Sequence, residues 1–295
     1  MSQSIALIGA GAMGGAIGAR LLETGSRLTV FDLDAEKVAA LVKKGAIAAN
    51  SAADAAKDAT AVITSLNASK TVEIAAFGPD GLSDGAAPGT LIIDMSSIDP
   101  VDTRRLAAMA SGKGLAWVDS PLSGGAPKAA IGQLTLMMGG EAGDVERAQD
   151  VLKAVATNMT HMGPAGAGQT TKIINQVLCG LGVLAVAEAT QLAQDAGVDA
   201  EKIPVALRGG RADSALLQEY MPRMANKDYR RTGRIDNMVK DLNMAAELSR
   251  ATGTSMPMTA LCAEIHRMLT AAGFGGEDQA AVMEFFNGAK RELGQ

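Results

Sequence analysis

The chain has 295 residues, of which 47% are hydrophobic, 20% are charged and only 3% are aromatic, and its net charge is −5 at neutral pH. This composition can bury a sizeable core in one large or two ordinary domains, and it excludes extensive disorder. The acidic balance and the few aromatic residues argue against a nucleic-acid partner.

The first 163 residues alternate between short apolar runs and helical patterns. Strands are predicted at 4–8, 27–31, 60–66, 90–95, 115–119, 133–140 and 159–163. Helices are predicted between them at 12–25, 34–45, 99–112 and 143–156. Strands that alternate with helices predict βαβ units and a parallel sheet, and therefore an α/β domain.

The pattern changes after Pro164. Residues 167–196 contain no proline and predict one long helix, whose Ala and Gly residues on several faces are typical of a helix buried by its neighbours. Only helices follow, at 200–210, 214–225, 235–253, 257–273 and 277–293. We therefore predict an α/β domain over residues 1–163 and an all-α domain over residues 164–295.

Neither the cysteines nor the apolar runs indicate a special environment. Cys179, Cys262, His161 and His266 are isolated, so we expect no metal site and a reducing compartment. The apolar N-terminal stretch has no basic residue before Arg20, unlike a signal peptide. The run LCGLGVLAVA is shorter than the about 20 residues that cross a bilayer. We expect a soluble, cytoplasmic protein without a membrane partner.

The stretch IALIGAGAMG places Gly9, Gly11 and Gly14 in the spacing G-x-G-x-x-G. It follows a predicted strand and opens a predicted helix, which is the context of a dinucleotide-binding turn. Gly9 would allow the tight turn, Gly11 the approach of a pyrophosphate and Gly14 close helix packing. With Ala12 and Met13, the helix start offers free N–H groups to the phosphates. A purely structural glycine turn is the alternative.

Asp32 directly follows the second predicted strand and lies 18 residues after Gly14. A carboxylate there can accept hydrogen bonds from an adenosine ribose, and it would repel the additional phosphate of NADP. NAD is therefore predicted rather than NADP. Alternatively, Asp32 only caps the following helix, which Asp34 could equally do.

Four blocks of sequence resemble, in order, the β-hydroxyacid dehydrogenase family, which includes 3-hydroxyisobutyrate dehydrogenases and tartronate semialdehyde reductases. They are IGAGAMG, DSPLSGGAPKAAIGQL, GAGQTTKIINQ and KDLNMA. The similarity covers nearly the whole chain. It implies an N-terminal Rossmann domain, a long linking helix and an all-α C-terminal domain, which agrees with the division predicted from periodicity.

The resemblance assigns Ser123, Gly124 and Gly125 to the substrate carboxylate. Consecutive glycines let backbone N–H groups converge on an anion, and a serine hydroxyl adds a donor. A glycine turn that joins two strands is the alternative. The same resemblance places Ser96 beside the nicotinamide ribose, although Ser96 could instead cap the helix after Pro100.

Lys172 and Asn175 lie three residues apart, hence on one helix face. Lys172 resembles the family's catalytic lysine and Asn175 the asparagine that orients substrate. An ordinary lysine, with a pKa of about 10.4, is a poor base at neutral pH. Burial and a positive nicotinamide ring could lower this pKa. The alternative is a surface lysine without a catalytic role. The apolar neighbours of Lys172 argue against it.

The remaining cofactor contacts are predicted at Ser65, Leu66 and Lys240. Ser65 and Leu66 end a strand at the carboxyl edge of the sheet. Lys240 resembles a family lysine near the nicotinamide end, or it only pairs with Asp241 on a solvated helix face. Arg211, Arg231 and Arg234 are candidates to bind a second acidic group on the substrate, unless they form a solvated basic face.

The sequence therefore predicts an NAD-dependent oxidoreductase that acts on a small β-hydroxy acid, either 3-hydroxyisobutyrate-like or polyhydroxylated, or on its semialdehyde. One alternative is an NADP-dependent aldehyde or imine reductase, and another is a dinucleotide-sensing protein without turnover. Large apolar faces in the all-α domain predict a homodimer or homotetramer, as in the family.

Overall fold

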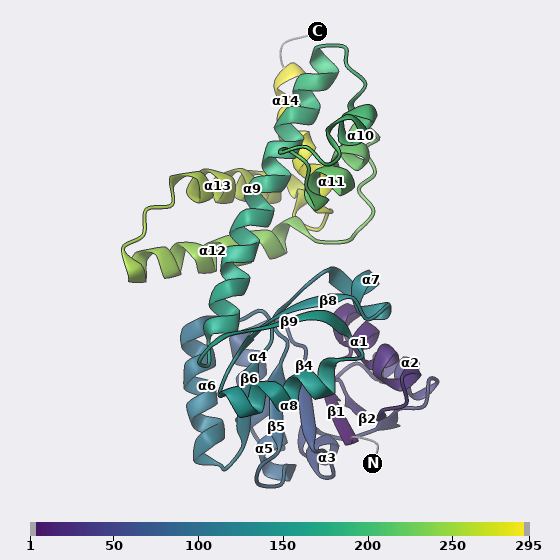
Figure 1. Cartoon of the computed structure of the whole chain (residues 1–295), viewed down its shortest axis with the longest axis vertical. Coiled ribbons are helices and arrows are strands. Elements are labelled where there is room, and N and C mark those ends of the chain that lie inside the picture. Colours follow the sequence, from purple (N-terminus) through teal and green to yellow (C-terminus); the bar gives the residue numbers. More distant parts are fainter. Residues whose placement is uncertain (1–3, 292–295) are drawn as a thin grey trace. The chain divides into compact units, whose positions relative to one another are not determined.

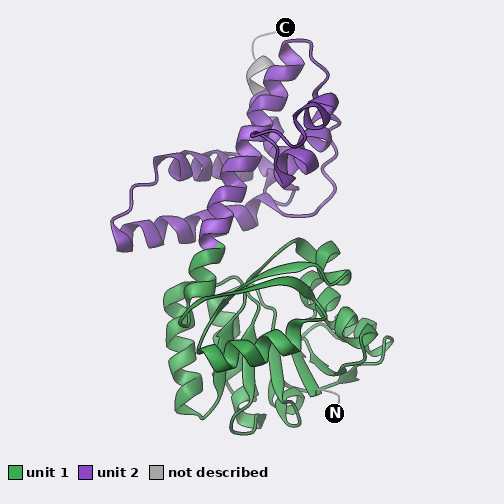
Figure 2. Cartoon of the chain, viewed as in Figure 1, with its two compact units in different colours: residues 1–172 green, residues 173–295 purple. Residues whose placement is uncertain are grey.

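The structure is a computed structural model that describes residues 4–291, with side chains up to residue 287. The chain divides into two compact units, Met1–Lys172 and Ile173–Gln295 (Figure 2). This division falls inside a long helix, nine residues after the domain boundary predicted at 163. The first unit is α/β and the second is helical, so the predicted fold class is confirmed.

The first unit is built on one sheet with the strand order β3-β2-β1-β4-β5-β6-β8-β7, and β9 pairs with β8 (Figure 1). Among the described residues the strands are β1 (Ser4–Ile8), β2 (Arg27–Phe31), β3 (Ile47–Ala48), β4 (Ala61–Thr64), β5 (Leu91–Asp94), β6 (Ala116–Asp119), β7 (Leu122–Ser123), β8 (Leu134–Gly139) and β9 (Ala156–Gly163). Strands β1 to β6 run parallel, whereas β8 runs antiparallel to β6 and β7. The carboxyl ends of β1, β2, β4, β5 and β6 therefore meet at one edge.

Both faces of this sheet are covered. Ile5 and Leu7 pack into one hydrophobic cluster, whereas Ala6 and Ile8 pack into the other, because successive strand residues point to opposite faces. The covering helices are α1 (Ala12–Glu23), α2 (Ala35–Val42), α3 (Ala52–Ala56), α4 (Ser69–Phe77), α5 (Leu82–Gly85), α6 (Pro100–Gly112), α7 (Gly125–Ala130) and α8 (Ala142–Leu152). Burial on both faces explains why the strands read as continuous apolar runs.

The second unit contains most of the long helix α9 (Ala167–Asp195) and only helices after it. These are α10 (Ile203–Leu207), α11 (Ala215–Ala225), α12 (Ile235–Thr252), α13 (Pro257–Leu269) and α14 (Met283–Arg291), with single turns η1 (Ala200–Lys202), η2 (Thr270–Phe274) and η3 (Gln279–Val282). The predicted helical segments are thus confirmed, although 200–210 and 277–293 each begin with a short turn. The end of the last one, residues 292 and 293, lies outside the described residues.

Helix α9 is long and apolar enough, by length and composition alone, to cross a membrane. The core helices of many soluble proteins pass the same test. Gly180 lies close to Met238, Leu242 and Cys262, so here a small residue does admit neighbouring helices. Only 33% of its most apolar 18-residue stretch is buried within the chain, however, so the predicted burial of α9 by its neighbours is incomplete.

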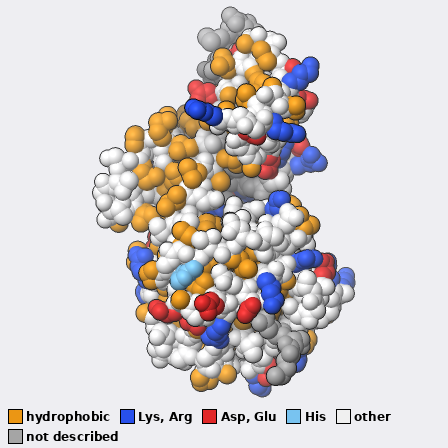
Figure 3. All heavy atoms as spheres, viewed as in Figure 1, with side chains coloured by type: hydrophobic (Ala, Val, Ile, Leu, Met, Phe, Trp, Pro, Cys, Tyr) orange, Lys and Arg blue, Asp and Glu red, His pale blue; other side chains and the backbone are white. Residues whose placement is uncertain are grey.

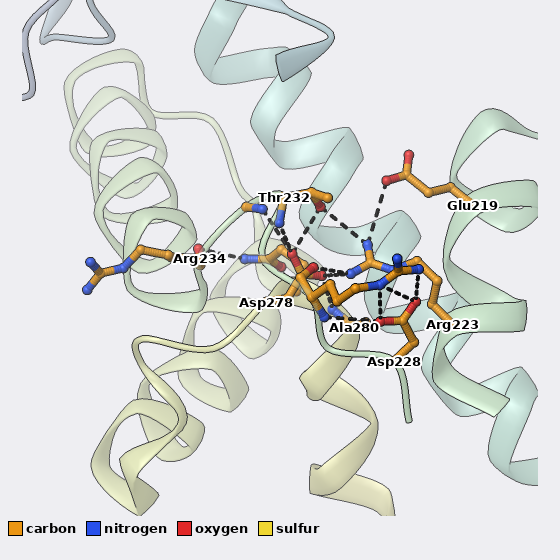
Figure 4. Close-up of polar contacts among 10 residues, drawn as sticks. Glu219, Arg223, Asp228, Thr232, Arg234, Asp278 and Ala280 are labelled. Carbon is orange, nitrogen blue, oxygen red and sulfur yellow. Dashed lines mark hydrogen bonds and ion pairs between the residues drawn. The ribbon is translucent and has the colours of Figure 1, made fainter. Parts of the chain in front are cut away.

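A buried ion pair organises the loop that leads into α12 (Figure 4). The Asp278 side chain is fully buried, and its carboxylate lies 2.9 Å from a guanidinium nitrogen of Arg223. It also accepts hydrogen bonds from the backbone N–H groups of Thr232, Gly233 and Ala280. Burial by itself would raise the pKa of Asp278, but these donors outweigh it and hold the pKa below its usual value. The carboxylate is therefore charged and fully bonded.

Replacement of Asp278 by Asn should destabilise the second unit by about 3 kcal/mol, because it leaves the Arg223 cation without its carboxylate. Urea unfolding followed by circular dichroism measures this loss. Asp228→Asn is the matched control, since Asp228 pairs with the exposed Arg230 and its loss should have a much smaller effect. Equal, small effects of the two substitutions would contradict the assignment.

Candidate active site

The three glycines of the first turn have different surroundings. A Cβ on Gly9, whose φ is +96°, would lie 2.4 Å from the carbonyl oxygen of Ser65, and one on Gly14 would lie 2.0 Å from the carbonyl oxygen of Gly9. A Cβ on Gly11 would meet no described atom within 4 Å. Gly9 and Gly14 are therefore required by packing, whereas Gly11 leaves open space at the start of α1. This arrangement fits the approach of a pyrophosphate.

Asp32 is tied to this glycine loop. Its carboxylate accepts hydrogen bonds from the backbone N–H of Ala10 at 2.7 Å and of Asp34 at 2.9 Å. The side chain that caps α2 is Asp34, which accepts from the N–H of Glu36. The alternative in which Asp32 caps that helix is therefore wrong. Each oxygen of Asp32 still has a lone pair that could accept a ribose hydroxyl.

Ser65, Leu66 and Ser96 come together at the ends of β4 and β5. Ser65 packs against Gly9, and the N–H of Leu66 donates to the Ser96 hydroxyl at 3.0 Å. Ser96 is buried and does not cap α6, because Asp99 accepts from the first N–H groups of that helix. The alternative role of Ser96 as a cap is therefore wrong. Direct contact of these residues with a cofactor stays a prediction.

Two buried carboxylates at the same edge were missed by sequence reasoning. Asp94 and Asp119 are the last residues of the neighbouring strands β5 and β6, and both are fully buried. Burial raises the pKa of Asp94 to about 6, although hydrogen bonds from Ser96 and Thr64 oppose the rise. Burial likewise raises the pKa of Asp119. The available signal was their position, an acidic residue at the end of an apolar strand.

The loop that contains Ser123, Gly124 and Gly125 has an unusual backbone. Ser123 ends β7 and is half-buried, and the two glycines have φ values of +119° and +71°. Both values lie in the region that favours glycine. The loop joins β7 to α7, not one strand to another as the alternative supposed. The backbone conformation alone accounts for both glycines, so carboxylate binding here stays a prediction.

Lys172 and Asn175 lie on successive turns of α9 as predicted, and both are half-buried. Of the apolar neighbours of Lys172, Ile173 is buried but Ile174 is 53% exposed. The expected shielding is therefore one-sided. Lys172 is the last residue of the first unit, and Asn175 belongs to the second.

Within the second unit, a chain of polar contacts connects Asn175 with Lys240. The Asn175 amide donates to Gln176, whose own amide donates to Asp241 at 2.5 Å. Asp241 in turn lies 3.3 Å from the Lys240 ammonium. The Lys240–Asp241 pair of the alternative hypothesis does exist, but Asp241 is 5% exposed and so does not lie on a solvated face. Gln176 was not identified from the sequence.

Two further polar residues considered from the sequence, Arg234 and His161, have local partners. Arg234 is ion-paired with Asp236, which reduces its capacity to bind a second acidic group on a substrate. His161 lies 2.9 Å from the carbonyl oxygens of Gly140 and Gly163, in keeping with a structural role. Within residues 4–291, no group of three or more His, Cys, Asp or Glu side chains could hold a metal ion.

Comparison with known proteins places this arrangement in context. Residues 4–163 match the family described as the NAD binding domain of 6-phosphogluconate dehydrogenase. Residues 166–286 match the family described as NAD-binding of NADP-dependent 3-hydroxyisobutyrate dehydrogenase. The two matches adjoin at the start of α9.

Individual relatives are similar along almost the whole chain. An NAD-dependent L-serine dehydrogenase from Pseudomonas aeruginosa is 37% identical over 292 residues, which cover 97% of this chain and 98% of the relative. An L-threonate dehydrogenase from Cupriavidus necator is 33% identical and covers 98% of this chain and 97% of its own. The solved structure of Mycobacterium tuberculosis 3-hydroxyisobutyrate dehydrogenase with L-serine has a TM-score of 0.88 at 30% identity, with 97% of this chain and 99% of that chain covered.

Alanine at Gly11 and at Gly14 should separate ligand binding from folding. Gly11→Ala should keep the melting temperature and weaken NAD binding at least about tenfold, because its methyl group enters the space where the pyrophosphate approaches. Gly14→Ala should lower the melting temperature, because its methyl group collides with Gly9. Calorimetric titration with NAD and thermal melts measure the two effects. Wild-type NAD affinity in Gly11→Ala would remove the assigned phosphate site.

Proposed function

The chain belongs to the β-hydroxyacid dehydrogenase family of oxidoreductases, and from this premise we propose which residues move a hydride and a proton between a short β-hydroxy acid and NAD. The observation that carries the proposal is the similarity along 97% of the chain to a dehydrogenase whose named substrate, L-serine, is itself a β-hydroxy acid.

NAD would be held by the first turn of the α/β unit. When bound, it accepts the hydride from the carbon that carries the hydroxyl. The N–H groups of Ala12, Met13 and Gly14 would bind its pyrophosphate beside the open space at Gly11. Asp32 accepts the ribose hydroxyls, and its charge disfavours the additional phosphate of NADP. Ser65, Leu66 and Ser96 would line the nicotinamide end. Lys240 stays a predicted cofactor contact.

Lys172 acts as the general base in oxidation and as the general acid in reduction. As the carbon that carries the hydroxyl gives up its hydride, the hydroxyl proton passes to the neutral Nζ of Lys172, which becomes an ammonium. The carbon–oxygen bond of the substrate becomes a carbonyl, and the proton leaves to solvent. In reduction the ammonium returns the proton to the carbonyl oxygen. Asn175, one turn further on the same helix face, orients the substrate.

The substrate class follows from the carboxylate site. Ser123, Gly124 and Gly125 bind a carboxylate, and Lys172 requires a hydroxyl a short distance from it. L-serine, L-threonate and 3-hydroxyisobutyrate all carry a hydroxyl on the carbon β to a carboxylate, and these compounds are named for relatives of this chain. We therefore propose a β-hydroxy acid of three or four backbone carbons.

A substrate panel tests this function. NADH formation at 340 nm should be observed with at least one of 3-hydroxyisobutyrate, L-serine, L-threonate and glycerate, and NAD should give a kcat/KM at least about tenfold above that with NADP. Lys172→Met should lower kcat at least about a thousandfold and keep NAD affinity. Lys153→Met, at an exposed lysine of the first unit, is the matched control and should have no effect.

The outcomes separate the competing functions. Unchanged turnover in Lys172→Met would refute the assigned base. NAD binding without turnover on any substrate would favour the sensing alternative. Preference for NADP together with an aldehyde or imine substrate would favour the reductase alternative.

We also propose that a second copy of the chain, not a bilayer, covers the apolar surface of the all-α unit. Ile174, Leu178 and Leu192 of α9 are more than half exposed, and they share one face because 18 residues make five helical turns. Met258, Leu261 and Met268 of α13 are also more than half exposed. Figure 3 shows hydrophobic side chains gathered over the part of this unit that contains α13. We expect a water-soluble cytoplasmic dimer or tetramer.

Leu178→Lys should shift the oligomer toward monomer, because a lysine on the shared α9 face would be buried without a partner. Size-exclusion chromatography with light scattering, in buffer without detergent, measures the change. Val101→Lys, at an exposed position of α6 in the first unit, should leave the mass unchanged. A monomeric wild type at micromolar concentration would contradict the interface.

A further inference from the structure

The first turn of α9 is capped by a side chain from a distant part of the sequence. The two oxygens of Asp119 accept hydrogen bonds from the backbone N–H of Gly166 at 2.8 Å and of Gln169 at 2.9 Å. These N–H groups would otherwise lack a partner at the start of a helix, and the carboxylate charge favours the positive end of the helix dipole. Asp119 therefore fixes the start of α9 at the end of β6.

The glycines around Asp119 show that this contact is tightly packed. A Cβ on Gly139 would lie 2.5 Å from one carboxylate oxygen of Asp119, and a Cβ on Gly168 would lie 2.7 Å from the other. The same atom on Gly168 would also lie 2.4 Å from the carbonyl oxygen of Met137. Only residues without a side chain fit here, so the position of this turn against β6 and β8 is tightly defined.

Gln169 extends the attachment to the loop after β5. This side chain is 1% exposed, and its amide nitrogen donates to the carbonyl oxygen of Ser96 at 2.8 Å. Its amide oxygen accepts from the N–H of Ile98 at 3.2 Å. The Ser96 hydroxyl in turn accepts from Leu66. One amide group thus connects α9 with the two loops assigned above to the nicotinamide end.

We propose that Gln169 is a positioning residue for the reaction: it fixes the α9 turn that carries Lys172 in register with the Ser96–Ile98 loop. This inference rests on the proposed function, because it takes Lys172 as the base and Ser96 as a neighbour of the nicotinamide. Gln169 precedes Lys172 by three residues, which is nearly one helical turn. Its side chain is 1% exposed and bonded to backbone groups, so it acts through the backbone and not by contact with substrate.

The physical reason is that proton transfer and hydride transfer both depend on how α9 is placed against the loops after β4 and β5. The proton acceptor belongs to α9, whereas the hydride acceptor is held by the loops after β4 and β5. A shift of about 1 Å between a base and its reacting partner can lower the rate about a hundredfold. Asp119 holds the end of the helix against β6, and a second attachment holds it against the Ser96–Ile98 loop. Gln169 provides that second attachment.

Two substitutions of Gln169 test the proposal. Gln169→Met keeps the size of the side chain and removes both hydrogen bonds, so kcat should fall about 10- to 100-fold while the KM values for NAD and the hydroxy acid change less than about threefold. In the coenzyme-free protein, the Ile98 amide should exchange its hydrogen faster, since it loses its acceptor. Gln194→Met, at an exposed glutamine near the other end of α9, is the matched control for both measurements.

In Gln169→Glu, protonation of the new carboxyl should restore the hydrogen bonds that the amide makes. A neutral carboxyl can donate to Ser96 and accept from Ile98 as the amide does, whereas a carboxylate can only accept and repels the Ser96 carbonyl. Burial raises the pKa of such a glutamate, and the neighbouring Asp119 and Asp94 carboxylates raise it further. In the reduction direction, kcat relative to wild type should be within about threefold at pH 5.5 and should fall at least about tenfold by pH 8.5. Circular dichroism confirms folding at both pH values.

The results distinguish this role from the function on which it rests. A wild-type kcat in Gln169→Met, or a ratio in Gln169→Glu that does not change with pH, overturns the positioning role alone. Turnover that persists in Lys172→Met overturns the proposed base and, with it, any role in positioning that lysine. A kcat loss in Gln169→Met with nearly unchanged KM values, joined to faster Ile98 exchange, supports the proposal.

Discussion

The hydrogen bonds from the first turn of α9 to Asp119 fix the position of the helix turn that carries the proposed base, Lys172. A helix start buried against a sheet must satisfy its N–H groups, and no acidic residue lies in the first turn of α9 to do so. The chain supplies the acceptor from the end of β6, about 50 residues earlier. Because Lys172 follows within two turns, its place on the helix is set by the sheet.

This solution carries an electrostatic cost. Asp119 lies beside Asp94 in the register of β5 and β6, and both are buried at the same sheet edge. Asp119 is compensated by backbone donors, whereas one oxygen of Asp94 lacks a hydrogen bond among the described residues, and burial raises its pKa to about 6. Because the folded state favours the protonated form of Asp94, the protonated carboxyl stabilises the fold. This stabilisation is fully present below about pH 4 and is lost as the pH rises through 6. At this sheet edge Asp119 is therefore well hydrogen-bonded, whereas the charged form of Asp94 is unfavourable.

Sequence patterns predicted the parts that depend on local periodicity. The alternation of apolar runs gave the long strands, the absence of proline gave α9, and the glycine spacing gave the first turn. Strands β3 and β7 were missed because two residues carry no period. Asp119 and Gln169 were missed because their partners are backbone atoms 47 to 73 residues away, which no spacing reveals. The choice between Asp32 and Asp34 as a cap likewise required coordinates.

Helix α9 has to bind polar groups in the first unit and to present an apolar face in the second. Its sequence places polar residues in its first turns and apolar residues after them. Its first turns carry polar residues, Gln169, Lys172, Asn175 and Gln176, which bind backbone and side-chain groups. Beyond them the helix is apolar, with Gly180 against α12 and α13 and with Leu178 and Leu192 exposed. A subunit that covers the apolar part would pack on the same helix that carries the proposed base and the residue proposed to orient the substrate. Assembly and catalytic geometry would then depend on the same 29 residues.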